Sequence, residues 1–153
     1  GEEIFQKDLD NLPGFLSQFC TMTLPWYYLS RLERVAFVDE ALYYSEGVVA
    51  RVEDGRNIIR KGDFILREND NLFVPALWND NEIIAYSGDG YENRSWLMPE
   101  GWEKVDAVDV YSISMNEPTL KSSAIPVNNG LLKLTLGKGE AVSIVPAGQV
   151  FTR

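Results

Sequence analysis

Residues 131–146, LLKLTLGKGEAVSIVP, alternate apolar and polar side chains with a period of two. The leucines at even-numbered positions share one face of an extended chain, while the lysine and threonine between them share the other. After a turn at 137–140, Val142 and Ile144 repeat the pattern and Ser143 points away. This period, with one polar face, is typical of antiparallel sheet, which can leave one side in water. The segment therefore predicts two antiparallel strands.

Short runs of branched and aromatic residues, separated by Asp, Asn and Gly, continue this pattern upstream. Between two such runs, the Asp54-Gly55 step supplies the positive φ angles of a tight hairpin. Because no helix-length segment separates the later runs, an α/β fold is disfavoured. We expect roughly nine to eleven strands, beginning near residue 35, in one antiparallel β-sandwich domain that covers residues 1–153. The clearest expected strands are 47–52, 57–60, 63–67, 72–75, 82–86, 91–97, 107–114 and 131–136.

A helix is expected before the strands, in the stretch DLDNLPGFLSQFC at residues 8–20. Asp10 or Asn11 can cap its N-terminus, and Pro13 suits the first turn because its missing N–H needs no partner there. A glycine in the first turn weakens the helix, so we expect two or three turns, about residues 11–20. The apolar side chains at i, i+3, i+4 and i+7 that would form its buried stripe are Leu12, Phe15, Leu16 and Phe19.

Composition excludes several classes of chemistry. The 153-residue chain has no His and one Cys, so triads with an imidazole base, His-bearing metal sites and zinc–thiolate clusters are ruled out. Its net charge of −9 repels phosphate backbones and anionic membranes, so we expect no nucleic-acid partner. No apolar run approaches the roughly 20 residues of a membrane span, so no membrane insertion is expected. Cys20 is expected to be a small buried residue beside the helix stripe.

Carboxylates are the remaining candidates for chemistry. Turns containing Glu68, Asp70, Asp80 and Asp89 offer the oxygen ligands that Ca²⁺ prefers, but Asx-turns explain Asp and Asn there without an ion. A glycosidase needs two carboxylates roughly 5–10 Å apart, and no motif in this sequence marks such a pair. We therefore expect no catalytic residue, no metal ion and no cofactor.

Aromatic side chains are the candidate ligand-binding residues, because exposed Trp and Tyr rings can stack on sugars. The candidates are Trp26, Tyr28 and Trp78. After Pro25 we expect extended chain, where neighbouring rings such as those of Trp26 and Tyr27 point to opposite faces, so that at least one is exposed.

Two further tryptophans are expected to be structural. Pro99 and Gly101 turn the loop between Trp96 and Trp102, so both indoles can fold back onto the sheet. Each would bury about 200 Å², a large share of the core of a small sandwich.

Two motifs relate this chain to a known family. Residues 11–19, NLPGFLSQF, and residues 91–102, YENRSWLMPEGW, resemble the NLP-x-x-FLQ-like helix and the tWtLP-x-GW stretch that follow the catalytic barrel in the bacterial endo-α-N-acetylgalactosaminidase family of glycoside hydrolases. As in that family, a valine-rich strand at 105–113 and a closing strand pair at 129–146 come next. The resemblance covers most of residues 11–147.

The resemblance implies an accessory role. In that family the catalytic carboxylates belong to an upstream TIM barrel, which needs about 250 residues and does not fit in this chain. The sandwich is then a buttress that packs on a barrel of the same polypeptide, with the helix of residues 11–20 at the junction and an apolar patch exposed when the barrel is absent. The resemblance further implies a parent enzyme that cleaves α-linked N-acetylgalactosamine from O-glycans and is exported or displayed at the cell surface.

Two other functions are left open. A carbohydrate-binding module would hold glycans on Trp26, Tyr28 or Trp78, whereas a small free-standing glycosidase would use two carboxylates of its own. Two exposed coplanar aromatic rings would favour glycan binding, and a flat apolar patch beside the helix would favour the accessory role.

Overall fold

The computed structural model describes residues 12–113 and 118–149 of the chain. Its helical segments are α2 (Leu12–Gln18), the π-turn η1 (Phe19–Thr23), α3 (Leu24–Ser30) and the short 3₁₀ turn η2 (Ser45–Gly47). Its strands are β1 (Arg34–Val38), β2 (Ala41–Tyr44), β3 (Val48–Glu53), β4 (Arg56–Lys61), β5 (Phe64–Glu68), β6 (Asn71–Pro75), β7 (Ile83–Ser87), β8 (Tyr91–Leu97), β9 (Ala107–Ser112), β10 (Thr119–Asn128), β11 (Leu131–Leu136) and β12 (Glu140–Pro146).

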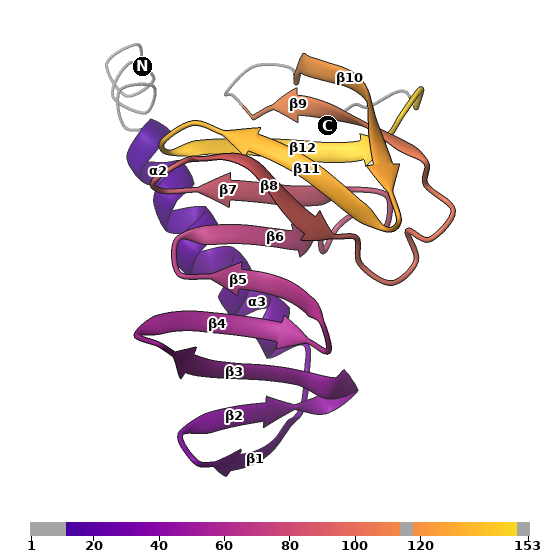
Figure 1. The fold of residues 1–153 in the computed structure, drawn as a ribbon. Helices are drawn as coiled ribbons and strands as arrows, with labels where there is room; N and C mark the ends of the chain where they lie inside the picture. The colour runs from indigo at the N-terminus through magenta and orange to yellow at the C-terminus, as the bar shows by residue number, and fades with distance from the viewer. Residues whose placement is uncertain (1–11, 114–117, 150–153) are drawn as a thin grey trace.

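The strands form one 12-stranded antiparallel sheet in the order β1-β2-β3-β4-β5-β6-β7-β12-β9-β10-β11-β8. The first seven strands form a meander, while β12 inserts between β7 and β9. The sheet then turns over, so that β8 and β11 lie across the outer face of β5 to β7 (Figure 1). The all-β antiparallel fold with a short N-terminal helix, expected from the sequence, is confirmed.

The helical region is longer than expected. Helical backbone continues past Cys20 through η1 and α3 to Ser30, so the prediction of a helix ending near residue 20 was wrong. Pro25 does not break it, because proline lies in the first turn of α3, where a missing N–H is tolerated. The preceding turn is widened, with the Leu24 N–H donating to the Phe19 carbonyl five residues back, a π-type bond.

The helix packs on one face of the sheet through Cys20 and Leu24, which are four residues apart and buried. Leu16 and Phe19 are partly buried against the same core, whereas Phe15 is exposed. The prediction that the stripe packs against the core is therefore confirmed for Leu16 and Phe19 and wrong for Phe15. Asp10 and Asn11, the expected caps, lie outside the described residues, as does the side chain of Leu12.

The opposite face of the sheet is covered by β8 and β11. Leu132, Leu134 and Leu136 are all buried, as their alternation predicts. Trp96 of β8 stacks on Phe73 of β6, with ring centroids 5.0 Å apart and planes within 4°.

Ser143 differs from its expected place on a polar face. Because β12 is a central strand, both of its faces are covered, and Ser143 is fully buried. Its hydroxyl donates to Oε2 of the buried Glu82 over 2.7 Å, which satisfies the polar group. The alternation of side chains is as predicted, but the sequence carries no sign that the helix covers the face to which Ser143 points.

Candidate functional site

An exposed apolar surface runs along the helix. It consists of Phe15, Met22, Trp26 and Tyr27, and we call these four residues the helix face. The exposed fractions of Phe15, Met22 and Trp26 are 62%, 65% and 63%. The same helix is anchored to the core through the buried Cys20 and Leu24. Large apolar groups gathered in this way commonly mark a contact surface.

Trp78 extends this surface from the connection between β6 and β7. With Phe15, Phe19 and Cys20 it lines a hollow of about 190 Å³. Its indole Nε1 donates to Oε1 of Glu82 over 3.2 Å, so the ring is held at one edge while 54% of the residue is exposed. Of the predicted stacking residues, Trp78 is therefore exposed and fixed in orientation.

Trp26 and Tyr28, the other predicted stacking residues, lie on α3 and not on a strand. The expectation of alternating faces was thus wrong for this segment, because Pro25 begins a helical turn. The rings of Trp26 and Tyr27 meet at 75° with centroids 5.3 Å apart, so they form no coplanar platform. Tyr28 is half-buried, and its burial, with a smaller contribution from Glu46, raises its pKa.

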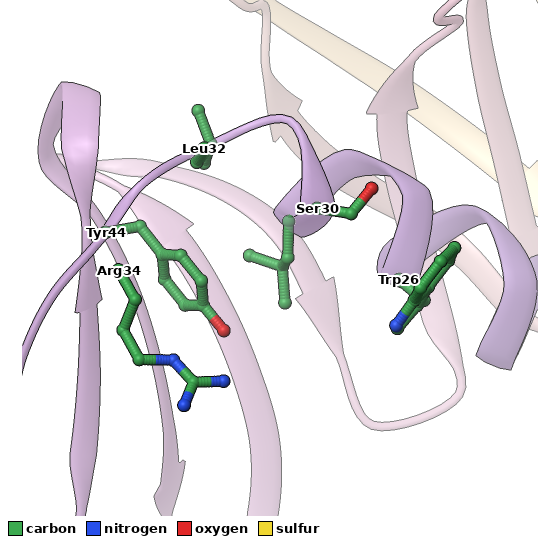
Figure 2. Close-up of a pocket in the computed structure, with 6 residues that line it drawn as sticks. Trp26, Ser30, Leu32, Arg34 and Tyr44 are labelled. Carbon is green, nitrogen blue, oxygen red and sulfur yellow. The ribbon is translucent and has the colours of Figure 1, made fainter.

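A second hollow, of about 240 Å³, lies where the helix meets the first two strands (Figure 2). Trp26 and Ser30 reach it from α3, Arg34 from β1 and Tyr44 from β2. The guanidinium of Arg34 and the phenol of Tyr44 give this end of the surface a polar border. A partner seated on the helix face would reach hydrogen-bonding groups here.

The residues expected to be structural lie in the core or next to it. Trp96 and Trp102 are buried. The backbone N–H of Trp102 donates to the Pro99 carbonyl over 3.1 Å. Gly101 has a φ of +96°, which a residue with a side chain rarely adopts. The indole Nε1 of Trp96 donates to the Tyr91 hydroxyl over 3.0 Å, and burial raises the pKa of Tyr91 to about 12.

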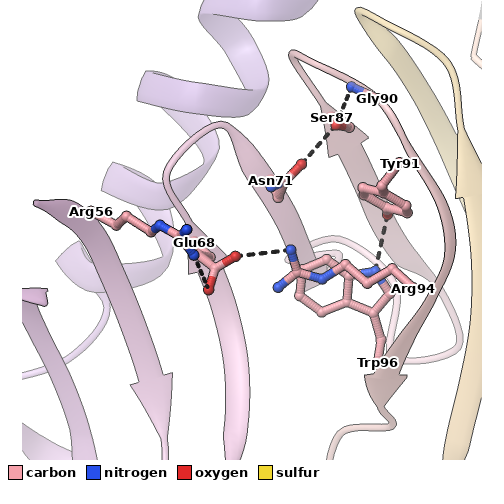
Figure 3. Close-up of polar contacts among 8 residues, drawn as sticks. All are labelled: Arg56, Glu68, Asn71, Ser87, Gly90, Tyr91, Arg94 and Trp96. Atoms are coloured by element: carbon pink, nitrogen blue, oxygen red, sulfur yellow. Dashed lines mark hydrogen bonds and ion pairs between the residues drawn. The ribbon is translucent and has the colours of Figure 1, made fainter. Parts of the chain in front are cut away.

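A charged cluster on the other face of the sheet was not foreseen (Figure 3). Glu68 accepts a hydrogen bond from Arg94 at 3.0 Å and pairs with Arg56 at 3.6 Å. The Arg94 guanidinium also lies 4.0 Å from the centre of the Trp96 ring, a cation–π arrangement. The cluster joins β4 and β5 to β8, and the one carboxylate of Glu68 is shared by two arginines. Pairing across strands far apart in sequence has no local signal that could have revealed it.

The carboxylates of the acidic turns do not gather. Glu68 is engaged by arginines, and Asp80 and Asp89 lie exposed in separate turns. Across residues 12–113 and 118–149, no three acidic or cysteine side chains come close enough to hold a metal ion. Within the same residues, no helix is both long and apolar enough to cross a bilayer.

The chain matches no protein-family model and no curated protein sequence. Functional inference therefore depends on the surface itself and on the two sequence motifs.

Proposed function

We propose that this chain is a non-catalytic β-sandwich accessory domain of a larger glycoside hydrolase that acts on O-glycans, and that the helix face packs against the catalytic barrel of the same polypeptide. The observation that carries the proposal is the exposure of Phe15, Met22 and Trp26 on a helix that is anchored to the core through Cys20 and Leu24. Such a surface is what an accessory domain presents when the domain it supports is absent.

The distribution of charge supports this orientation. Tyr44 borders the helix, and the register of β2, β3 and β4 places Arg60 and Glu53 on the opposite side of the sheet. The Arg56–Glu68–Arg94 cluster lies on that opposite side as well, under β8. The apolar side chains of the helix face are thus separated from the ion pairs. Burying each of these large side chains in an interface would contribute about 1.5–3 kcal/mol before the costs of association.

The test compares Trp26→Lys in two contexts. In the isolated chain, Trp26 is exposed, so the free energy of unfolding is expected to change by no more than about 0.5 kcal/mol. In the longer natural polypeptide, the lysine would be buried against the barrel, and we expect a clear loss of thermal stability. Val52→Lys is the control, because Val52 is equally exposed but lies on β3 and does not belong to the helix face.

Two results would reject this proposal. One is a natural polypeptide that encodes no catalytic barrel beside this domain. The other is a longer polypeptide in which Trp26→Lys and Val52→Lys have equally small effects, because the helix face would then contact nothing.

Direct glycan binding is the second candidate, and the fixed orientation of Trp78 favours it. A sugar could stack on the exposed indole, which the bond to Glu82 holds in place. Calorimetric titration with N-acetylgalactosamine-bearing O-glycans tests this: binding that Trp78→Ala abolishes and Trp26→Ala preserves would replace the accessory role. Turnover of an aryl glycoside by the purified chain would instead establish a free-standing glycosidase.

A further inference from the structure

The hollow between α3 and the first two strands gathers several hydrogen-bond donors (Figure 2). Arg34 is opposite Tyr44 in the ladder between β1 and β2, so their side chains leave the sheet on the same face. Trp26 and Ser30 are four residues apart on α3 and therefore lie on one side of that helix. The sheet and the helix thus bring the guanidinium of Arg34, the phenol of Tyr44 and the indole of Trp26 to one space.

These three donors have no acceptor in the part of the chain that the structure describes. No acidic side chain there pairs with the Arg34 guanidinium, and neither the Tyr44 hydroxyl nor the Trp26 indole N–H donates a hydrogen bond there. The Ser30 hydroxyl donates to the Tyr27 carbonyl over 2.9 Å, so its oxygen is left to accept. A guanidinium has five N–H donors and keeps its charge, so this hollow suits a ligand that is rich in acceptors and negatively charged.

The neighbouring charges favour a ligand with a single negative charge. Among the described residues that line this hollow, Arg34 alone is cationic. On the other side of Leu32, an adjoining hollow is lined by Arg31 and by two carboxylates, Glu33 and Glu46. A phosphate monoester would bring a second negative charge that no cation matches, in a chain whose net charge is −9. A carboxylate instead matches the guanidinium with two parallel hydrogen bonds.

The remaining walls favour a small ring as the body of the ligand. Leu29 and Leu32 are partly buried against the core and supply apolar surface, and the exposed ring of Trp26 lines the same space. A sugar ring offers C–H groups that stack on an indole, and hydroxyls that the Ser30 oxygen can accept from. The volume of about 240 Å³ is below the roughly 300–1,000 Å³ of sites for drug-sized ligands, so one ring fits better than a long chain.

We propose that this hollow is a binding site for a sugar acid, a single sugar ring that carries one carboxylate. The carboxylate pairs with Arg34 and accepts from the Tyr44 hydroxyl, while the ring lies against Trp26. This site goes beyond the proposed accessory role, because all of its residues belong to the present chain. If a barrel packs on the helix face, to which Trp26 also belongs, the sugar acid would lie at the border of two domains, where ligand sites are common.

NMR titration of the ¹⁵N-labelled chain with D-glucuronate tests the site. Signals of residues 26–34 and of Tyr44, together with the Nε–H signal of Arg34, are expected to shift and to saturate. We expect a Kd in the millimolar range, because the hollow is open to water, which competes for the same donors. D-glucose has the same ring without the carboxylate, and it is expected to bind at least tenfold more weakly.

Three variants assign the contacts. Arg34→Gln removes the charge and should weaken glucuronate binding at least tenfold. Arg31→Gln is the matched control, because this arginine lines the adjoining hollow; its Kd should stay within about twofold of the wild type. Tyr44→Phe keeps the ring and loses the hydroxyl, so a weakening of about threefold to tenfold is expected. Urea denaturation of each variant verifies that the fold is retained.

The position of the sugar is tested with two tryptophan variants. Trp26→Ala should weaken glucuronate binding, whereas Trp78→Ala, in the other hollow, should leave it unchanged. These titrations use the isolated chain, so they are independent of whether the helix face contacts a barrel in a longer polypeptide.

Four results would overturn the proposal. The first is the absence of a saturable shift with glucuronate. The second is equal binding of glucose and glucuronate, because the carboxylate would then not be recognised. The third is an equal loss of binding in Arg31→Gln and Arg34→Gln, which would indicate general attraction by positive charge. The fourth is tighter binding of glucose 6-phosphate than of glucuronate, which would make this a phosphate site.

Discussion

The central strand β7 and the edge strand β1 have similar sequences but opposite environments. β7 reads IIAYS and all five of its residues are buried, whereas β1 reads RVAFV and four of its five are exposed. The difference comes from what covers them: β7 lies between the helix and the β8–β11 layer, and β1 lies beyond both (Figure 1). Burial in this fold is therefore set by place in the sheet, not by residue type.

The largest expected effect comes from removing a ring that packs between the central sheet and the β8–β11 layer. Phe73 is fully buried between Phe64 and Trp96, so Phe73→Ala should lower the free energy of unfolding by about 3–5 kcal/mol. The same change in β1, Phe37→Ala, should cost less than about 1 kcal/mol. Urea denaturation of both variants measures the contrast, and equal losses would show that β1 is covered in solution.

A smaller effect is expected from the hydrogen bond between Tyr91 and Trp96, both of which lie on β8. Tyr91→Phe removes the acceptor of the buried Trp96 indole N–H, which should cost about 1–3 kcal/mol. Trp96 fluorescence should report the change of environment. Tyr43→Phe on β2 is the control, since Tyr43 is exposed and should tolerate the loss of its hydroxyl. Matching stabilities for the two variants would refute a role for this bond.

Alkaline pH probes two buried groups, Cys20 on the helix and Tyr91 on β8. Burial raises the pKa of Cys20 from 9.0 to about 12 and that of Tyr91 from 10.0 to about 12. Because both groups lose their protons more easily in the unfolded chain, their contribution to stability is complete below the unfolded pKa and declines as pH rises toward 12. In Cys20→Ala the decline between pH 9 and 10 should be shallower than in the wild type. Parallel curves from thermal melts would contradict the burial of this thiol.

The smallest expected effect is confined to the edge. Glu40 has a positive φ of 62° in the β1–β2 turn, a conformation that glycine adopts without strain. Glu40→Gly should therefore stabilise this hairpin slightly, by about 0.5 kcal/mol, which hydrogen exchange of β1 amides can detect. Unchanged or faster exchange in β1 would show that the backbone conformation of Glu40 does not limit the stability of the β1–β2 hairpin.

Local patterns in the sequence predicted most of the strands well. The alternation at 131–136 and the run at 91–97 correspond to β11 and β8 with the same bounds, and the Asp54-Gly55 step lies in the β3–β4 turn. Each of these signals depends on neighbours along the chain. β10 was missed because its exposed residues, with Ala124 at a φ of 52°, show no two-residue rhythm.

The candidate site was predicted less completely. Trp26 and Trp78 were identified as exposed aromatics, but Phe15 was expected in the buried stripe, and Met22 was not singled out because its direction depends on the π-turn. The turn moves every later side chain around the axis, and no simple periodicity encodes it. The Glu68–Arg94 contact likewise joins residues 26 apart, which a local pattern cannot relate.

The insertion of β12 between β7 and β9 has a consequence for how the chain folds. The middle of the sheet can close only after residues 140–146 have been synthesised and have found two partners, one of which precedes them by more than 50 residues. Pairings of such long sequence separation are slow, and we expect refolding on the millisecond-to-second scale typical of β-rich domains with high contact order. Before β12 pairs, the edge of β7 that faces away from β6 has no partner strand. A chaperone or a neighbouring domain could cover this edge during folding.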